Sequence, residues 1–490
     1  MKGTSFLLLI LLLTATVYGQ RMPVADTSIV TKHHIVGQYQ SFDYSAITGQ
    51  QPVWDEGGDV LATVHFTYYT REDVSNRSER PLVISFNGGP GSGSVWMHLA
   101  YTGPRLLNID EEGYPLQPYG VKENPFTILD VADIVFVDPV NTGFSRILDD
   151  TADRSQFFGV NADIKYLAEW INTFVTRFDR WTSPKYLIGE SYGTTRVAGL
   201  ARELQEAQWM YLNGVILVSP TDLGINRAGA VEQANRWPYY AATAWFHNRL
   251  DQDLQQIDLE ELLPRVETFA INDLLPALAK GASIDSVERM HIIKQMSRFS
   301  GLSEIVIAQN NLNIPTNLFW KELLRDEGKT IGRLDSRYIG IDFRDAGERP
   351  DYNAELSSWL HSFTPAINHY YANELDYKTD VKYNMFGPVH PWDRSRDNTG
   401  MDLRKAMAEN PFLQLMVQSG YYDGACDYFN AKYNLWQMDP SGKLNSRIRF
   451  KGYRSGHMMY LRKEDLIMAN EDIRTFIKES LPKPDQPAKY

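Results

Sequence analysis

The sequence is poor in cysteine, because Cys426 is the only one in 490 residues. A single thiol cannot form an intrachain disulfide, so the fold must be stabilised by its buried core. A chain of this length is able to bury a large core, and its length corresponds to two or three domain-sized units.

The sequence is also short of positive charge. It has 49 lysines and arginines against 61 aspartates and glutamates, for a net charge of -12 and a pI of about 5.4. Proteins that bind nucleic acid need a basic surface to neutralise phosphates. The composition therefore argues against nucleic acid as a partner.

Long hydrophobic runs are missing as well. The one marked run, Phe6 to Leu13, is shorter than the roughly 18 residues that cross a bilayer. It follows Lys2 and precedes small residues near Val17 and Gly19, the pattern of a cleaved secretory signal. We expect a signal peptide over residues 1–19 and no membrane span. An exported chain without disulfides is typical of a bacterial periplasm or cell exterior.

Short apolar runs alternate along the chain with segments of helical periodicity. This alternation predicts an α/β protein with a mostly parallel sheet. The first two runs, joined by a polar loop, predict an opening hairpin. The runs expected to be strands lie at residues 60–69, 81–86, 133–138, 186–189, 214–218, 412–417 and 447–450.

Residues 226–375 differ from the rest, because their apolar residues recur at helical spacing and form no buried-strand run. We interpret this segment as a helical cap inserted into a core formed by residues 20–225 and 376–480. The remaining residues, 481–490, contain prolines and are expected to form a flexible tail.

A nucleophile elbow is predicted at Gly189-Glu190-Ser191-Tyr192-Gly193. The G-x-S-x-G pattern follows an apolar run and precedes a helical segment, and in this context it exposes a serine hydroxyl at the end of a strand. The flanking glycines leave room for a strained turn. Ser191 is therefore the candidate nucleophile.

A serine nucleophile needs a base and a group that orients the base. In an α/β-hydrolase fold an acid and then a histidine follow late strands, which identifies Asp423 and His457. Both follow predicted strands, whose carboxyl ends form the ligand-binding edge of open α/β sheets. Asp427 is an alternative acid, although a place at a helix start explains it better. Among the other histidines, His98 is expected to be a buried structural residue.

The segment Asn87 to Gly93 is rich in glycine and follows a predicted strand. It lacks the lysine and the Ser/Thr of a phosphate-binding loop. A tight turn beside the elbow would instead direct backbone N–H groups at a developing negative oxygen. We expect the N–H groups of Gly89 and Tyr192 to form this oxyanion hole.

Five blocks together resemble the serine carboxypeptidases, the S10 peptidase family, and in particular its bacterial, disulfide-free branch. They occur in family order and extend from residue 87 to residue 458. The blocks are Asn87-Gly88-Gly89-Pro90-Gly91, Asp138 to Ser145, Gly189 to Gly193, Gly420-Tyr421-Tyr422-Asp423 and Gly456-His457-Met458.

The resemblance implies that single residues are removed from the C-termini of peptides. It also implies that the Asn87 side chain, the Gly88 N–H and the Glu190 side chain bind the terminal carboxylate of the substrate. Two negative charges about 4 Å apart repel by roughly 4 kcal/mol at an effective dielectric near 20, so one of the two carboxyls must be protonated. We therefore expect activity to be favoured at acidic pH.

The sequence departs from the family at Tyr101, where many relatives carry a second glutamate. Without a pair of acids sharing one proton, Glu190 is expected to titrate at lower pH. Arg105 is close in sequence and is a candidate for a compensating positive charge. Relatives often place a cysteine near the active site, which suggests that role for Cys426, although a small buried apolar side chain is an equally good interpretation.

We thus expect an α/β-hydrolase fold with a helical cap that acts as a serine-type carboxypeptidase on peptides with a free C-terminus. No residue cluster has metal-ligand spacing, and no cofactor is expected. An esterase or acyltransferase on the same triad, an exopeptidase of unusual specificity such as dipeptide release, and a silent binding protein are the alternatives.

Overall fold

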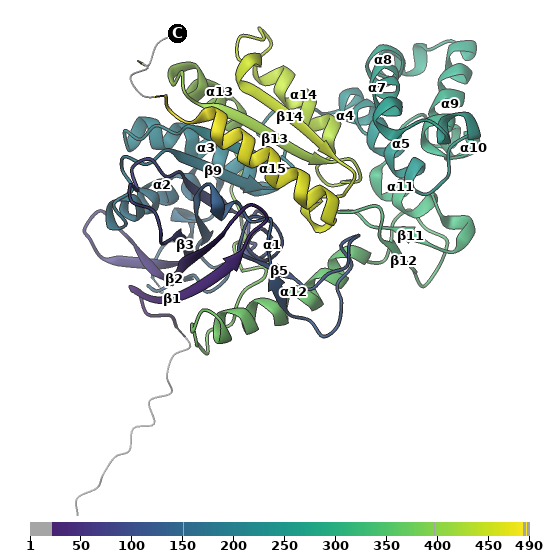
Figure 1. The fold of residues 1–490 in the computed structure, drawn as a ribbon. Helices are drawn as coiled ribbons and strands as arrows, with labels where there is room; N and C mark the ends of the chain where they lie inside the picture. The colour runs from purple at the N-terminus through teal and green to yellow at the C-terminus, as the bar shows by residue number, and fades with distance from the viewer. Residues whose placement is uncertain (1–21, 150, 396, 484–486, 488–490) are drawn as a thin grey trace, which may run out of the picture.

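One large sheet organises the molecule (Figure 1). The computed structural model describes residues 22–149, 151–395, 397–483 and residue 487, so the expected signal peptide and most of the expected tail lie outside the described residues. Within them the strands of the sheet pair in the order β1-β2-β3-β7-β4-β9-β10-β13-β14, and β8 also pairs with β3.

The strands have the following bounds: β1 (Thr27–Val36), β2 (Ser41–Trp54), β3 (Val60–Arg71), β4 (Leu82–Phe86), β7 (Asp133–Asp138), β8 (Arg146–Ile147), β9 (Lys185–Glu190), β10 (Gly214–Val218), β13 (Gln414–Gly420) and β14 (Ile448–Tyr453). Two small ribbons pair β5 (Arg105–Leu107) with β6 (Val121–Glu123), and β11 (Thr330–Ile331) with β12 (Ile339–Gly340).

The sheet is mostly parallel where the predicted site lies. Strands β7, β4, β9, β10, β13 and β14 run parallel, whereas β1, β2 and β3 are antiparallel to their neighbours. The predicted opening hairpin is wrong, because β7 lies between β3 and β4 and pairs with both. The polar loop at residues 71–80 shows only that the chain turns between β3 and β4. It does not show that β7, whose residues are more than fifty positions from their partners, pairs between them.

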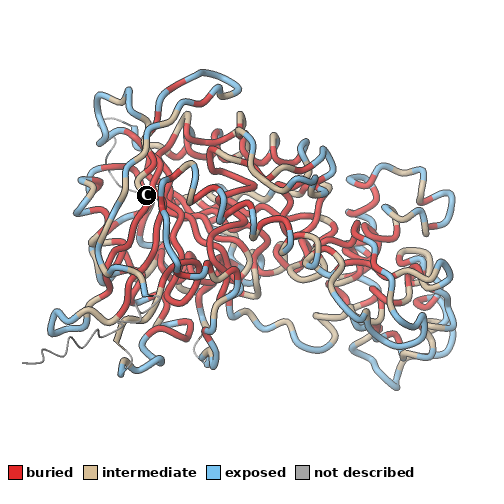
Figure 2. Tube along the Cα trace, turned by 90° about the horizontal axis from the view of Figure 1, so that it is seen from below, coloured by how far each residue is buried: buried red, intermediate tan, exposed pale blue. Residues whose placement is uncertain are grey.

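Alternating residues of the strands face two hydrophobic layers. On β7, Ile134 and Phe136 belong to one buried cluster, and Val135 and Val137 belong to the other. Helices α1 (Val95–Ala100), α12 (Ala354–Asn373) and α15 (Lys463–Ser480) contribute to the first cluster. Helices α2 (Val160–Arg177), α3 (Tyr192–Ala207) and α13 (Thr399–Glu409) contribute to the second. The sheet is therefore covered on both faces, and its buried residues form a continuous centre in Figure 2.

The helices have the following bounds: α1 (Val95–Ala100), α2 (Val160–Arg177), α3 (Tyr192–Ala207), α4 (Ala230–Asn235), α5 (Trp237–Phe246), α6 (Gln252–Gln255), α7 (Leu259–Phe269), α8 (Leu275–Lys280), α9 (Ser286–Ser300), α10 (Glu304–Gln309), α11 (Thr316–Glu322), α12 (Ala354–Asn373), α13 (Thr399–Glu409), α14 (Tyr428–Met438) and α15 (Lys463–Ser480).

Helices α4 to α11 form a lobe with a hydrophobic cluster of its own, visible in teal in Figure 1. Tyr422, Tyr428 and Phe429, which follow β13, belong to the same cluster and join the lobe to the sheet. The β11–β12 ribbon was not predicted, and α12 packs on the sheet side, in the cluster that contains α1. The division of the chain into a core and a cap stays a prediction.

We find no helix in the described part of the chain that combines the length and the hydropathy needed to cross a bilayer.

Candidate active site

Ser191 lies at the sharp turn between β9 and α3. Its backbone has φ 57° and ψ -126°, a left-handed conformation that costs roughly 1–3 kcal/mol for a non-glycine residue. The turn is held in place by the N–H of Ser191, which donates to the carbonyl of Val218 at 2.9 Å. The hydroxyl-bearing residue is only partly buried, as a nucleophile that receives a substrate must be.

The glycines on either side are required by close backbone contact. A Cβ at Gly189 would lie 2.1 Å from the carbonyl oxygen of Gly193, and a Cβ at Gly193 would lie 2.8 Å from that of Phe86. Neither backbone atom can move without displacing the elbow. The G-x-S-x-G pattern is thus explained by packing.

We expect Gly189→Ala to lower the free energy of unfolding by roughly 1–3 kcal/mol, because the new methyl group overlaps backbone atoms. Urea denaturation measures the change. Gly120→Ala is the matched control, since a Cβ there meets no atom within 4 Å. Equal stability of the two variants would contradict this account of the elbow.

The glycine-rich loop after β4 lies against the elbow. A Cβ at Gly88 would be 2.5 Å from the backbone nitrogen of Tyr192 and 2.9 Å from the Cβ of Ser191. Gly89 has φ +108°, which favours glycine. Gly89 and Tyr192 line one cavity together with Ser191, so the two predicted oxyanion donors lie beside the nucleophile.

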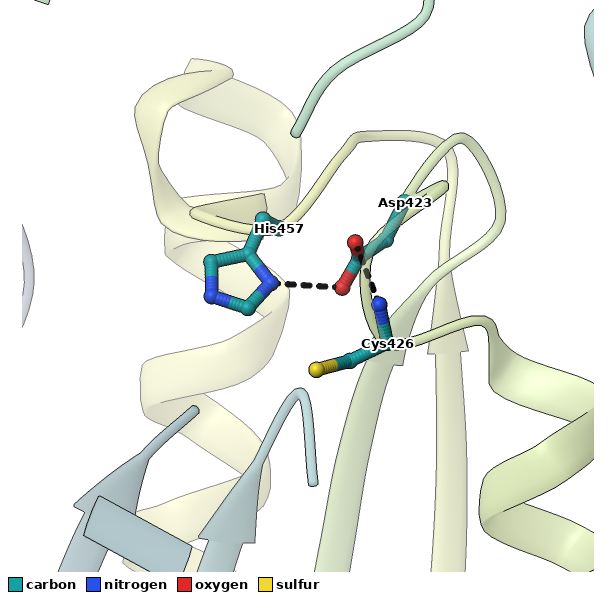
Figure 3. A group of neighbouring side chains, drawn as sticks. All are labelled: Asp423, Cys426 and His457. Carbon is teal, nitrogen blue, oxygen red and sulfur yellow. Dashed lines mark hydrogen bonds and ion pairs between the residues drawn. The ribbon is translucent and has the colours of Figure 1, made fainter. Parts of the chain in front are cut away.

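Asp423 and His457 lie on neighbouring loops after the paired strands β13 and β14. The Asp423 Oδ2 atom and the His457 Nδ1 atom are 2.7 Å apart (Figure 3). The other oxygen of Asp423 accepts from the backbone N–H groups of Ala425 and Cys426, each at 2.9 Å. Both side chains are almost fully buried.

The charge of Asp423 also tunes the imidazole. Burial by itself lowers the pKa of His457, but the Asp423 carboxylate, its hydrogen bond and the charge of Glu190 together outweigh burial and leave the pKa raised. A raised pKa makes the ring a stronger base toward a hydroxyl proton.

The alternative acid, Asp427, has a different place. Its side chain caps α14, accepting from the N–H and the side-chain amide of Asn430 at 2.9 and 2.6 Å. This is the helix-start role that the sequence suggested. His98 is fully buried, as expected, with its ring 2.6 Å from the Tyr69 hydroxyl.

Ser191 and His457 line one cavity of about 230 Å³, together with Gly88, Gly89 and Glu190. Its remaining wall is largely apolar and is formed by Trp96, Leu356, Trp359, Phe386 and Met458, with Ser92, Arg333 and Leu334. A second cavity of about 520 Å³ shares Gly89, Ser191, Arg333 and Leu334 with the first, and it is lined by Tyr192 but not by Glu190. The nucleophile thus lines two pockets of different chemistry.

Glu190 and Asn87 are buried and in contact. The Asn87 amide donates to one oxygen of Glu190, and the Tyr460 hydroxyl donates to the other at 2.7 Å. The loop carrying Asn87 is fixed by Arg196, which donates to the Asn87 carbonyl at 2.7 Å and pairs with Asp163 at 2.7 Å.

Burial raises the pKa of Glu190 to about 7, against smaller opposing effects of His457, Tyr460 and Asn87. The expectation that Glu190 titrates lower without a second acid is therefore wrong. Tyr101 stacks on Tyr460 with ring centroids 4.6 Å apart, and its hydroxyl donates to Gln418 at 2.6 Å. These rings help to exclude water from Glu190. Burial thus raises the pKa of Glu190, as a second acid sharing its proton would have done.

Arg105 does not compensate for charge at Glu190. Its guanidinium pairs with Glu374 at 2.6 Å, and the residue does not line either cavity beside Ser191. The candidate role for Arg105 is thus corrected, because its partner comes from the end of α12.

The segment Arg333–Leu334, which was not predicted from the sequence, contacts the loops of both Asp423 and His457. The N–H of Gly424 donates to the Arg333 carbonyl at 3.0 Å, and the N–H of His457 donates to the Leu334 carbonyl at 2.6 Å. No local motif marks this segment. Tyr460 was also missed, although its position three residues after His457, beside the last block, was an available signal.

Among the described residues one group has spacing suited to a metal ion, namely Asp423, Cys426 and His457, whose ligand atoms lie within 4.8 Å of one another (Figure 3). Burial, and then the charge of Asp423, raise the pKa of the Cys426 thiol well above its usual value, so the thiolate needed for a metal is disfavoured. The Nδ1 atom of His457 is already bonded to Asp423. The group is better suited to orienting an imidazole.

Comparison with known proteins agrees with this geometry. Residues 58–448 match the family described as serine carboxypeptidase. The chain belongs to this family. It is 28% identical over 220 residues to serine carboxypeptidase-like 16 of Arabidopsis thaliana, covering 43% of this chain and 48% of that protein. It is 34% identical over 141 residues to the human retinoid-inducible serine carboxypeptidase, covering 29% and 28%.

The matches therefore span half or less of these relatives' lengths. Among solved structures, the fold resembles Kex1Δp, a prohormone-processing carboxypeptidase from Saccharomyces cerevisiae, with a TM-score of 0.52 and 15% identity over 89% of this chain and 92% of that one. The predicted α/β-hydrolase fold is confirmed, and so is the resemblance to the S10 peptidases.

Proposed function

We propose that this member of the serine carboxypeptidase family is an exported serine carboxypeptidase that removes the C-terminal residue of peptides. One observation carries the proposal: a buried carboxyl, Glu190, contacts an amide, Asn87, in the same cavity as Ser191 and His457. An ester needs no acid at this place, whereas a protonated carboxyl and an amide can both donate hydrogen bonds to a terminal carboxylate.

In the proposed reaction Ser191 attacks the carbonyl of the last peptide bond while His457 takes its proton. Asp423 holds the ring with Nδ1 protonated and stabilises the imidazolium. The N–H groups of Gly89 and Tyr192 donate to the developing oxyanion. His457 then protonates the departing amine, and water activated by the same ring releases the acyl group.

The cavity with the apolar wall would hold the departing residue, with its carboxylate against Asn87, Gly88 and protonated Glu190. Peptides with a free C-terminus are the proposed partners. The proposed export, to a bacterial periplasm or exterior, is supported by the pattern of residues 1–19.

The function is tested with three blocked dipeptides that end in phenylalanine and differ only at the terminus, as free acid, amide or ester. We expect kcat/KM to be highest for the free acid when Glu190 is protonated. Equal use of amide and ester with no preference for the acid would instead indicate an esterase or acyltransferase on the same triad. Release of a dipeptide from a longer peptide would indicate the unusual exopeptidase.

Use of the free acid is expected to fall as pH rises through about 7, because Glu190 loses its proton near that pKa and then repels the substrate. At lower pH the activity should also fall, because protonated His457 can no longer take the proton of Ser191. In Glu190→Gln the neutral amide cannot ionise, so the decline above pH 7 should disappear for the free acid. The ester profile is the control, and an unchanged decline in the variant would contradict the assignment.

A further inference from the structure

The cavity on the Tyr192 side of Ser191 carries an excess of unpaired positive charge. Three arginines line it, Arg227, Arg333 and Arg394. Arg394 faces Asp222 and Asp397 at 3.8 and 3.9 Å. In the part of the chain that the structure describes, no carboxylate pairs with Arg227 or Arg333.

The acids facing this cavity, Asp222 and Asp427, cancel the charge of its three arginines only in part. Asp222 is the partner of Arg394. Asp427, whose two oxygens accept from Asn430, lies near enough to Arg227 for that guanidinium to oppose the rise that burial causes in its pKa, so it offsets part of the charge. In the adjoining cavity of about 600 Å³, which Arg227 and Arg333 also line, Glu232 pairs with Arg236. Positive charge thus exceeds negative charge around the cavity beside Ser191, which can hold an anion.

Arg333 is held in a fixed place beside the reacting groups. The carbonyl of Arg333 accepts from the N–H of Gly424, which follows Asp423. The next residue, Leu334, accepts from the N–H of His457 through its carbonyl and donates its N–H to Glu355 at 2.9 Å. Arg333 and Arg227 both oppose the rise that burial causes in the pKa of Cys426, which places both charges near the loop after β13.

The two pockets divide the substrate. Glu190 lines only the apolar cavity of the two that Ser191 lines, so the departing residue and its carboxylate belong there. The residue that becomes bound to Ser191 must then enter the other cavity, which Arg227 lines and which shares Arg333 with the apolar one. Guanidinium groups present several donors in a planar fork that matches a carboxylate.

We propose, building on the proposed carboxypeptidase function, that Arg227 and Arg333 select substrates with an acidic side chain on the residue before the scissile bond. Such a substrate pairs its carboxylate with guanidinium groups that have no ion-pair partner among the described residues. A neutral substrate of the same shape leaves both charges unpaired.

The test compares N-blocked Glu-Phe with N-blocked Gln-Phe, which differ by one charge at nearly equal shape. At pH 6 the glutamate side chain is ionised, since its usual pKa is about 4.3. We expect kcat/KM for Glu-Phe to exceed that for Gln-Phe by about fivefold or more, as partly exposed ion pairs allow, and the ratio to shrink with added salt. In the double variant Arg227→Gln, Arg333→Gln the ratio should approach one.

Arg394→Gln is the matched control, because Arg394 lines the same cavity but already has acidic neighbours, and it should keep the wild-type ratio. Arg227→Glu tests the reverse preference: in this variant kcat/KM for N-blocked Lys-Phe should rise relative to that for N-blocked Gln-Phe.

Equal kcat/KM of the wild-type protein for Glu-Phe and Gln-Phe would overturn the inference without contradicting the proposed carboxypeptidase function. An equal loss for both peptides in Arg333→Gln would show that Arg333 binds the terminal carboxylate instead, which also overturns it. Hydrolysis of neither peptide would remove both proposals.

Discussion

Ser191→Ala is expected to lower kcat for a peptide with a free C-terminus by at least about 10⁴-fold. The alanine keeps the elbow backbone, with its hydrogen bond to Val218, but has no oxygen to attack the peptide carbonyl. The oxyanion donors Gly89 and Tyr192 remain, so any residual rate reports what they and substrate binding contribute. Steady-state kinetics with active-site titration measures the loss.

A fluorophosphonate should label the wild-type protein and fail to label Ser191→Ala. Ser41→Ala, an exposed serine at the start of β2, is the matched control and should keep both labelling and activity. Thermal melting shows whether the variant is folded. Full activity in folded Ser191→Ala would refute the triad, and no labelling or turnover in the wild-type protein would favour a silent binding protein.

Asp423→Asn is expected to lower kcat by roughly 10⁴-fold while leaving the fold intact. One oxygen of Asp423 accepts from the N–H groups of Ala425 and Cys426, so the asparagine oxygen should keep that place. The new NH₂ group would then face His457 Nδ1 and force that nitrogen to accept. The proton moves to the other ring nitrogen, which can no longer take a proton from Ser191.

Asp427→Asn is the matched control, because asparagine is as good a helix cap as aspartate. Activity should change little in this variant, whereas stability should fall somewhat, because the new NH₂ group faces the Asn430 amide that donated to the replaced oxygen. The pair of substitutions therefore decides which acid orients His457. A large loss of activity in Asp427→Asn with none in Asp423→Asn would reverse the assignment.

The local sequence pattern predicted the positions of strands but not their order in the sheet. All seven expected runs contain strand residues, because apolar residues between polar ends need cover on both faces of a sheet. The order of the strands was not available in the same way. Strand β7 lies between β3 and β4, since pairing of distant segments depends on the whole sheet and not on the turn that joins neighbours. The strands β1 and β2 were missed because their pattern is largely polar.

The residues of the candidate site were likewise predicted where a local pattern marks them. Ser191 follows β9 directly, and Asp423 and His457 lie on the short loops after β13 and β14. Parallel strands bring their carboxyl ends to one edge, so the sequence was sufficient to propose the three residues together. The sequence also determined the elbow, because two glycines and a serine at fixed spacing are what such a turn can accommodate.

Only the tertiary structure decided the surroundings of these residues. Arg105 pairs with Glu374, far along the chain, and so leaves the site. Arg333 comes to the nucleophile from within the helical segment, through bonds to two loops that are distant in sequence. The pKa of Glu190 rises because the folded chain removes water from it. The sequence alone determines residue types and local turns, whereas burial and charge pairing arise only when distant segments pack together.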